Sequence, residues 1–124
     1  MLICYDIYFP EAARILALKK ARLILVSSAD WKPLETVVRR FIPSRALENN
    51  LHIVYVNRAG VEGDYHYFGE SCIANPKGDI ICRLSDREGF LVKEIDVGET
   101  QPPELSTFCL ENRRPDIYDP LQMR

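Results

Sequence analysis

The first 56 residues alternate between short apolar runs and longer segments in which apolar residues recur every three or four positions. The short runs predict β-strands, and the longer segments predict helices that share one apolar face. The order is strand, helix, strand, helix, strand, with strands at residues 2–4, 22–27 and 52–56 and helices at 10–20 and 33–49. Helices of this length between apolar strands predict an α/β layered sheet.

The first predicted helix runs from Pro10 to about Lys20. Proline is favourable in the first turn of a helix, and lysines near its end complement the helix dipole. The spacing of Ala12, Ile15 and Leu16 predicts that these three residues share its buried face. The strand that follows is almost continuously apolar, which indicates a strand covered on both faces or a parallel one.

The second predicted helix runs from Pro33 to Asn49. Pro43 lies inside it and removes a backbone donor, so we expect a kink there. Five apolar residues have the spacing of a buried face: Leu34, Val37, Val38, Phe41 and Ile42.

The pattern changes after residue 56. Residues 60–69 are rich in glycine and aromatic residues and predict a loop. Three short strands are expected at 71–74, 79–84 and 89–95, with residues 75–78 as the turn of a hairpin between the first two. From about Gly98 the chain is expected to be an extended tail that packs on a neighbour. We interpret residues 1–124 as a single domain.

Composition and charge narrow the class of protein. With 124 residues and 47% hydrophobic content, the chain can bury one core. A formal net charge of -2, without long single-sign runs, argues against nucleic acid or a membrane surface as the main partner. The apolar runs are too short to span a bilayer, and no signal peptide is visible. We therefore expect a cytoplasmic protein.

Four cysteines are spread widely along the chain, without a C-x-x-C pair or a histidine cluster, so no zinc site is expected. Cys72 and Cys82 lie in apolar alternating runs and are interpreted as small buried hydrophobes, whereas Cys109 is left open. Cys4 differs, because a strand that ends in a cysteine, turns and enters a helix presents a sulfur nucleophile. No residue before it supplies a base or a cation, so the chain looks like the second half of an enzyme.

Several separated blocks together resemble the nitrilase superfamily of carbon–nitrogen hydrolases. They occur in the family's order and cover essentially the whole chain. The blocks are Ile3-Cys4-Tyr5-Asp6, Phe9-Pro10-Glu11 with Arg14, Arg45-Ala46-Leu47-Glu48-Asn49, Val56-Asn57-Arg58-Ala59-Gly60, Glu62-Gly63, Phe68-Gly69-Glu70-Ser71, Pro76-Lys77-Gly78 and Arg113-Arg114-Pro115-Asp116-Ile117-Tyr118.

The resemblance implies an αββα sandwich, of which this chain would form half. It also implies a Glu-Lys-Cys catalytic set, usually assisted by a second glutamate, in which the cysteine forms a thioester with an amide or nitrile carbon. Cys4 matches the nucleophile, and the backbone N–H of Tyr5 matches one donor of the oxyanion site. The glutamates and the lysine lie before the cysteine in the family, so this chain is expected to be incomplete. No metal or organic cofactor is implied.

The resemblance also favours a small amide as the substrate. The family's carbamoyl-amino-acid hydrolases carry arginines just after the nucleophile, where this chain has Asp6-Ile7-Tyr8, so that subclass is disfavoured. Ligands of open α/β sheets lie beyond the carboxyl ends of strands. We therefore take Tyr8, Trp31, Asn57 and Phe68 as substrate-pocket candidates, although Tyr8, Trp31 and Phe68 could equally cover the core.

Substitutes for the missing catalytic groups can be sought within the chain. His66 is a possible base or a polar loop residue, and His52 a possible base or a structural strand residue. Lys32 either reaches the site or is a solvated loop lysine. Arg45 and Glu48 are either catalytic or form a structural ion pair or cap.

Half of a two-sheet sandwich leaves an apolar sheet face uncovered, larger than soluble monomers normally expose. We therefore expect a homo-oligomer, or pairing with a missing N-terminal half. Two functions remain open: an amidase-type carbon–nitrogen hydrolase that needs further residues, and a non-catalytic association domain that retains the fold.

Overall fold

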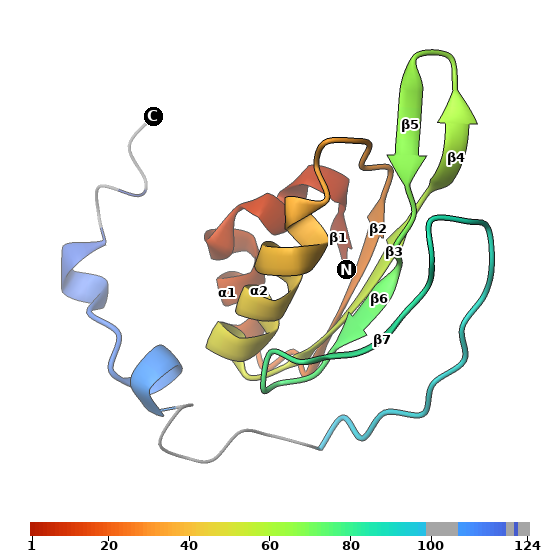
Figure 1. The fold of residues 1–124 in the computed structure, drawn as a ribbon. Helices are drawn as coiled ribbons and strands as arrows, with labels where there is room; N and C mark the ends of the chain where they lie inside the picture. Colours follow the sequence, from red (N-terminus) through yellow and green to blue (C-terminus); the bar gives the residue numbers. More distant parts are fainter. Residues whose placement is uncertain (99–106, 119–120, 122–124) are drawn as a thin grey trace.

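The computed structural model describes residues 1–98, 107–118 and 121, and its centre is a five-stranded sheet with helices on one face (Figure 1). The strand order is β1 (Leu2–Ile3), β2 (Leu23–Ser28), β3 (His52–Asn57), β6 (Cys72–Ala74) and β7 (Ile80–Arg83). The first three strands are parallel, and β6 and β7 add antiparallel to β3. The predicted α/β class and the predicted parallel β2 are therefore confirmed.

Two helices cover the sheet. The segment from Pro10 to Leu18 forms α1, with Pro10 in its first turn, where its missing N–H is not needed. A π-helical turn, η2 (Val37–Phe41), continues directly into α2 (Ile42–Asn49). Left-handed residues follow both helices: Lys20 has φ 68° and Asn50 has φ 51°. Such residues end a helix by turning the chain away from its axis.

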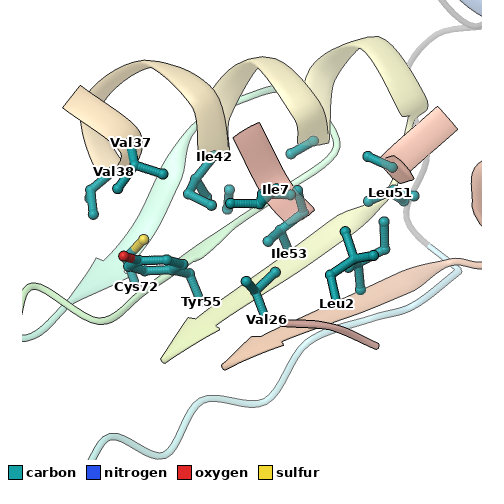
Figure 2. Packing of buried hydrophobic residues seen from close by; sticks show 14 of the residues in the cluster. Leu2, Ile7, Val26, Val37, Val38, Ile42, Leu51, Ile53, Tyr55 and Cys72 are labelled. Atoms are coloured by element: carbon teal, nitrogen blue, oxygen red, sulfur yellow. The ribbon is translucent and has the colours of Figure 1, made fainter. Parts of the chain in front are cut away.

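The helices and the sheet enclose one hydrophobic core (Figure 2). On the helix side it contains Val37, Val38 and Ile42, which confirms the predicted buried face of the second helix. On the sheet side it contains Ile53 and Tyr55, both fully buried. Alternate residues of β3 therefore point to the helices, as the period of two in a strand requires.

The predicted buried face of α1 is partly wrong. Ala13 and Ala17 are its buried residues, whereas Ile15 is 52% exposed. Ile15 lies two positions from each alanine, which places it about 200° around the helix at 100° per residue. The alanines allow α1 to approach its neighbours closely, and Ile15 is left on the opposite side.

The second helix begins later than predicted, because helical residues start at Thr36 rather than Pro33. Pro43 lies in the first turn of α2, immediately after the π-helical turn. Proline cannot donate the backbone hydrogen bond that a continuous α-helix needs at that position. The irregularity expected at Pro43 is therefore the π-helical turn directly before it. Such turns are a common cause of distortion in helices.

Residues 60–69, predicted to be a loop, instead form most of a hairpin. It consists of β4 (Ala59–Glu62) and β5 (Tyr65–Phe68), and it projects beyond the end of the main sheet (Figure 1). Glu62 pairs with Tyr65, so Gly63 and Asp64 form a two-residue turn. Gly63 has φ 57°, which a two-residue hairpin turn requires and glycine adopts readily.

The strand predicted at 89–95 is absent. β6 and β7 confirm the strands expected at 71–74 and 79–84, but residues 86–96 pair with no strand among the described residues. Phe90 and Val92 are 89% and 87% exposed. A strand without a partner has no ladder of hydrogen bonds to stabilise it.

The described part of the tail forms two short helical turns, η3 (Thr107–Glu111) and η4 (Pro115–Ile117), instead of a continuous extended segment. Arg14 of α1 donates a hydrogen bond to the backbone carbonyl of Cys109 at 2.8 Å, so this part of the tail packs on the chain itself. The rest of the predicted tail, at 99–106, 119–120 and 122–124, lies outside the described residues.

One face of the sheet carries no helix formed by the described residues (Figure 1). Large aliphatic side chains on this face are exposed: Ile3 by 61%, Leu25 by 47% and Val56 by 55%. The strands are therefore buried on one face only, which corrects the option that β2 is covered on both. The expectation of an uncovered apolar sheet face is confirmed for this chain. No helix among the described residues is long and apolar enough to cross a membrane.

Candidate functional site

The carboxyl ends of the three parallel strands meet at one edge of the sheet. Ile3 is in register with Ser27, and Ser28 is in register with Asn57. Cys4 follows β1 directly and Asp30 follows β2 by two residues, so both lie at the same edge as Asn57. Ligand sites of open α/β sheets commonly form at this edge.

Cys4 begins the short 3₁₀ helix η1 (Cys4–Tyr8) immediately after β1. Its φ is 48°, in the left-handed region, so the chain turns sharply at the cysteine. Positive φ is uncommon for a residue with a side chain and is found disproportionately at functional sites. The predicted strand–turn–helix presentation of the sulfur is confirmed, and the side chain is half-buried.

The Cys4 sulfur faces the carboxylate of Asp30, with Sγ 3.9 Å from Oδ1. Tyr8 donates its hydroxyl to the same oxygen at 3.1 Å. The other oxygen, Oδ2, accepts hydrogen bonds from the hydroxyls of Ser28 and Tyr55, each at 2.6 Å. Asp30 is only 3% exposed, so these donors replace the water that would otherwise solvate it.

The two tyrosines remain protonated over the physiological range. Burial, together with the charge and the hydrogen bond of Asp30, raises the pKa of Tyr8 well above its ordinary value. Burial and the hydrogen bond to Asp30 raise the pKa of Tyr55 further still. Both phenols therefore act as hydrogen-bond donors to the carboxylate.

Asn57 holds the loop that carries Asp30. Its side-chain oxygen accepts the Asp30 backbone N–H at 2.8 Å, and its side-chain nitrogen donates to the carbonyls of Asp30 and Gly69 at 3.1 and 3.0 Å. The residue is 7% exposed. The amide is thus engaged in structural hydrogen bonds, and its assignment to the substrate pocket stays a prediction.

Arg45 and Glu48 form an ion pair, with Nη1 3.1 Å from Oε1. Arg45 also donates from Nη2 to the backbone carbonyl of Tyr8 at 3.1 Å and lies over the ring of Phe41. Of the two interpretations left open for this pair, the structural ion pair is the one found. Arg45 thereby fixes the end of η1 against α2.

The histidine and lysine candidates lie away from the sulfur. His52 is 1% exposed at the amino end of β3, the edge opposite Cys4. His66 is exposed on β5, and its backbone carbonyl accepts the N–H of Lys32, which is also exposed. Neither His66 nor Lys32 hydrogen-bonds Cys4.

The remaining pocket candidates differ in exposure. Tyr8 is half-buried beside Cys4, and Trp31, next to Asp30, is 40% exposed with its ring against Tyr65. Phe68 is 1% exposed and belongs to the core. The structure gives Phe68 a packing role, and the assignment of Tyr8 and Trp31 to the substrate pocket stays a prediction.

All four cysteines are free thiols. Cys72 is 2% exposed, as predicted for a buried hydrophobe, whereas Cys82 and Cys109 are half-buried. Burial raises the pKa of the Cys72 thiol to about 12. The described residues contain no group of three or more metal-ligating side chains.

Sequence reasoning missed Asp30 and its donor Tyr55. The available signal was position: Asp30 follows the carboxyl end of a parallel strand, the same edge that holds Cys4. In the sequence, nothing distinguishes Tyr55 from the other apolar residues of β3. Only the register of the strands brings its hydroxyl to the carboxylate.

A sequence model described as carbon–nitrogen hydrolase matches residues 1–102, which include the Cys4 turn, the Asp30 loop and the sheet. This chain belongs to the carbon–nitrogen hydrolase family. Among curated relatives, it is 41% identical over 126 aligned residues to "Hydrolase in pqqF 5'region" of Pseudomonas protegens, covering 99% of this chain and 43% of that protein. An (R)-stereoselective amidase of Pseudomonas sp. is 35% identical, with 92% of this chain and 42% of the relative covered.

Solved structures give the same family. An amidase from Nesterenkonia sp. AN1 superposes with a TM-score of 0.82 at 30% identity, covering 97% of this chain and 44% of the amidase. A mutant of that amidase, with TM-score 0.79, 31% identity and coverage of 94% and 41%, carries the acetamide moiety of fluoroacetamide covalently on its active site cysteine. This carbon–nitrogen hydrolase chain thus spans less than half the length of the relatives it matches, and the prediction that it forms part of their fold is confirmed.

Proposed function

We propose that this chain is the nucleophile-bearing part of an amidase-type carbon–nitrogen hydrolase, with Cys4 as the nucleophile. The observation that carries the proposal is the placement of Cys4. It occupies a left-handed turn between β1 and η1, at the carboxyl edge of the sheet, with its sulfur half-buried. The fold around it superposes on an amidase whose active site cysteine reacts covalently.

The proposed reaction breaks the bond between the carbonyl carbon and nitrogen of an amide. The Cys4 sulfur attacks the carbonyl carbon, a C–S bond forms, and the C–N bond breaks as the nitrogen takes up a proton and leaves as ammonia. Water then adds to the thioester, releasing a carboxylic acid and restoring the thiol. The backbone N–H of Tyr5 would stabilise the negative oxygen that develops in each step, since the first N–H groups of a helical turn have no acceptor within it.

The chain needs further groups for this chemistry. A thiol has a pKa of roughly 8.5, so a base must remove its proton near neutral pH. Among the described residues, Asp30 is the side chain in hydrogen-bonding range of the Cys4 sulfur, and three hydroxyls already occupy it. We propose that a glutamate base and a lysine come from outside these 124 residues.

The substrate we propose is a small amide rather than a nitrile. The structural relative from Nesterenkonia has been captured with butyramide, and a curated relative is named an (R)-stereoselective amidase. The proposed pocket residues are Tyr8, which is near the reacting sulfur along the chain, and Trp31, which lies at the same edge of the sheet. We also propose a cytoplasmic location, where the free thiols of the chain stay reduced.

The test begins with the coding DNA upstream of Met1. The proposal expects an in-frame segment that contains a glutamate and a lysine at predicted strand ends. The extended protein should release ammonia from butyramide, and Cys4→Ala should abolish the release. A stop codon directly upstream, or turnover that survives Cys4→Ala, would contradict the proposal.

A second function is favoured by the uncovered sheet face. Ile3, Leu25 and Val56 expose apolar side chains on three neighbouring strands, and burying such a surface favours association. A non-catalytic association domain would use this face without the chemistry of Cys4. Under this alternative, the chain sediments above its monomer mass of 14.3 kDa, and Leu25→Lys returns it to that mass.

A further inference from the structure

The Asp30 carboxylate is a buried charged group for which the proposed reaction has no use as a base or nucleophile. It is 3% exposed and lies against the sulfur that we propose as the nucleophile. We propose that Asp30 is a positioning residue for Cys4: its carboxylate accepts a hydrogen bond from the thiol and orients the sulfur until a base arrives. This inference rests on the proposed role of Cys4.

The geometry leaves one carboxylate oxygen for the thiol. Oδ2 accepts two short hydrogen bonds, from Ser28 and Tyr55, each at 2.6 Å. Oδ1 accepts a longer hydrogen bond from Tyr8, at 3.1 Å, and the Cys4 sulfur lies 3.9 Å from the same atom. A carboxylate oxygen has room for two donors, so Oδ1 is free to accept from the thiol.

The carboxylate cannot rotate away from the sulfur. Three hydroxyls come from three different elements: Tyr8 from η1, Ser28 from the end of β2 and Tyr55 from β3. The backbone of Asp30 is held separately by the side chain of Asn57. The acceptor therefore has a fixed direction, which is what a group that orients a neighbouring side chain requires.

The charges around Asp30 determine in which direction it changes the reactivity of the Cys4 sulfur. The titratable groups that face it are Cys4, Tyr8 and Tyr55, and no lysine or arginine among the described residues forms an ion pair with it. Arg45 of α2 approaches only the backbone carbonyl of Tyr8 and is paired with Glu48. A negative carboxylate beside the sulfur repels the negative charge that develops there when the sulfur reacts.

The same contacts occupy most of the acceptor capacity of Asp30. Three hydroxyls donate to its two oxygens, and Oδ1 has room for one further donor. We therefore assign Asp30 the role of a hydrogen-bond acceptor for the thiol. The role differs from that of a catalytic base, which must bind and release the proton in each cycle.

The test measures how fast the Cys4 thiol is alkylated, with the 124-residue chain and iodoacetamide as the probe. The rate at Cys4 is followed by peptide mass spectrometry from about pH 6 to about pH 9, because the thiolate is the reacting form. Asp30→Asn removes the charge and keeps the shape. We expect Cys4 in this variant to be labelled faster near neutral pH, by up to about tenfold.

Asp6→Asn is the matched control, because Asp6 is an exposed carboxylate on the same 3₁₀ helix. It accepts the Ile3 N–H at 2.9 Å, which the oxygen of an asparagine also accepts. Its profile should coincide with that of the wild type, since solvent screens an exposed charge. An equal shift in both variants would overturn the proposal, because the effect would then be one of net charge.

Tyr8→Phe should change the labelling rate of Cys4 in the opposite direction, and it tests the inference even if Asp30→Asn does not fold. It frees Oδ1 for the thiol and leaves the charge, so labelling of Cys4 near neutral pH should slow by roughly two- to fivefold. Folding is checked by far-ultraviolet circular dichroism. Faster labelling in Tyr8→Phe, or an unchanged profile in folded Asp30→Asn, would overturn the inference. These rates are independent of hydrolysis, so a failed amidase assay leaves them interpretable.

Discussion

Removing one hydroxyl from the Asp30 network should destabilise the whole fold. In Tyr55→Phe the buried ring stays, and only the donor to Oδ2 is lost. The ring is fully buried and the acceptor is 3% exposed, so water cannot replace the hydroxyl. A hydrogen bond to a charged group contributes about 1.5–3 kcal/mol, and we expect a loss of about 2 kcal/mol in the free energy of unfolding.

Urea denaturation measures this loss. With a slope of roughly 2 kcal/mol per molar urea for a small domain, the midpoint of Tyr55→Phe should fall by about 1 M. All variants are compared at one protein concentration, because association makes stability depend on it. Tyr67→Phe is the control, since the Tyr67 ring stacks on Tyr65 but its hydroxyl has no hydrogen-bond partner among the described residues.

A double-mutant cycle tests whether the lost stability comes from the interaction between Tyr55 and Asp30. Tyr55→Phe in an Asp30→Asn background should cost about 1 kcal/mol less than it does in the wild type, because the charged acceptor is already gone. The reasoning would be refuted if Tyr55→Phe lowered the stability by less than about 0.5 kcal/mol, as a typical surface substitution does. Equal costs in the two backgrounds would show that the hydroxyl acts independently of Asp30.

Two further predictions concern the backbone and the pH dependence. Gly69→Ala should lower the stability by about 1–3 kcal/mol in urea denaturation, since Gly69 has φ 65° and an added Cβ would lie 3.0 Å from the Ser85 carbonyl oxygen. Gly63→Ala, with φ 57° and open space around the Cβ, should cost less, and an equal cost would show that the contact is unimportant. Burial raises the pKa of Cys72 from about 9.0 to about 12, so the folded state keeps a proton that the unfolded state loses. The unfolding free energy should therefore fall as pH rises through this window, and the fall should be shallower in Cys72→Val; equal slopes would contradict the assignment.

Local patterns in the sequence predicted the elements that carry the fold. The apolar runs of β2 and β3 and the helical spacing around Val38 each depend on neighbours within a few residues, so they could be identified without a structure. Cys4 was identified in the same way, because its strand, turn and helix are consecutive. The hairpin of β4 and β5 was missed because its glycines hide the alternation of its strands, although Gly63 and Asp64 are a typical two-residue turn.

The surroundings of Cys4 could not be predicted, because they depend on register. The hydroxyl of Ser28 is local to Asp30, but those of Tyr8 and Tyr55 reach it only because β1, β2 and β3 pair side by side. The strand predicted at 89–95 also failed because of tertiary pairing: its apolar run Phe90-Leu91-Val92 favours a strand, but no described strand lies beside it. Tertiary pairing decides such segments, whatever their local propensity.

The site also bears on which part of the proposed chemistry lies within this chain. It holds the sulfur at a sharp turn and a fixed carboxylate beside it, while its exposed Lys32 and His66 do not bond to that sulfur. Rate enhancement by a nucleophile depends on an activating base and on groups that stabilise the developing charge. Under the proposed function, this chain would present the nucleophile, and groups outside it would activate it.

Ammonia release from butyramide by the purified 124-residue chain tests this separation most directly. The account predicts that the chain and its Cys4→Ala variant release ammonia at the same background rate, because Asp30, the carboxylate that the described residues place in hydrogen-bonding range of the sulfur, already accepts hydrogen bonds from three hydroxyls. Turnover by the chain that disappears in Cys4→Ala would contradict it, since the base would then lie within these residues.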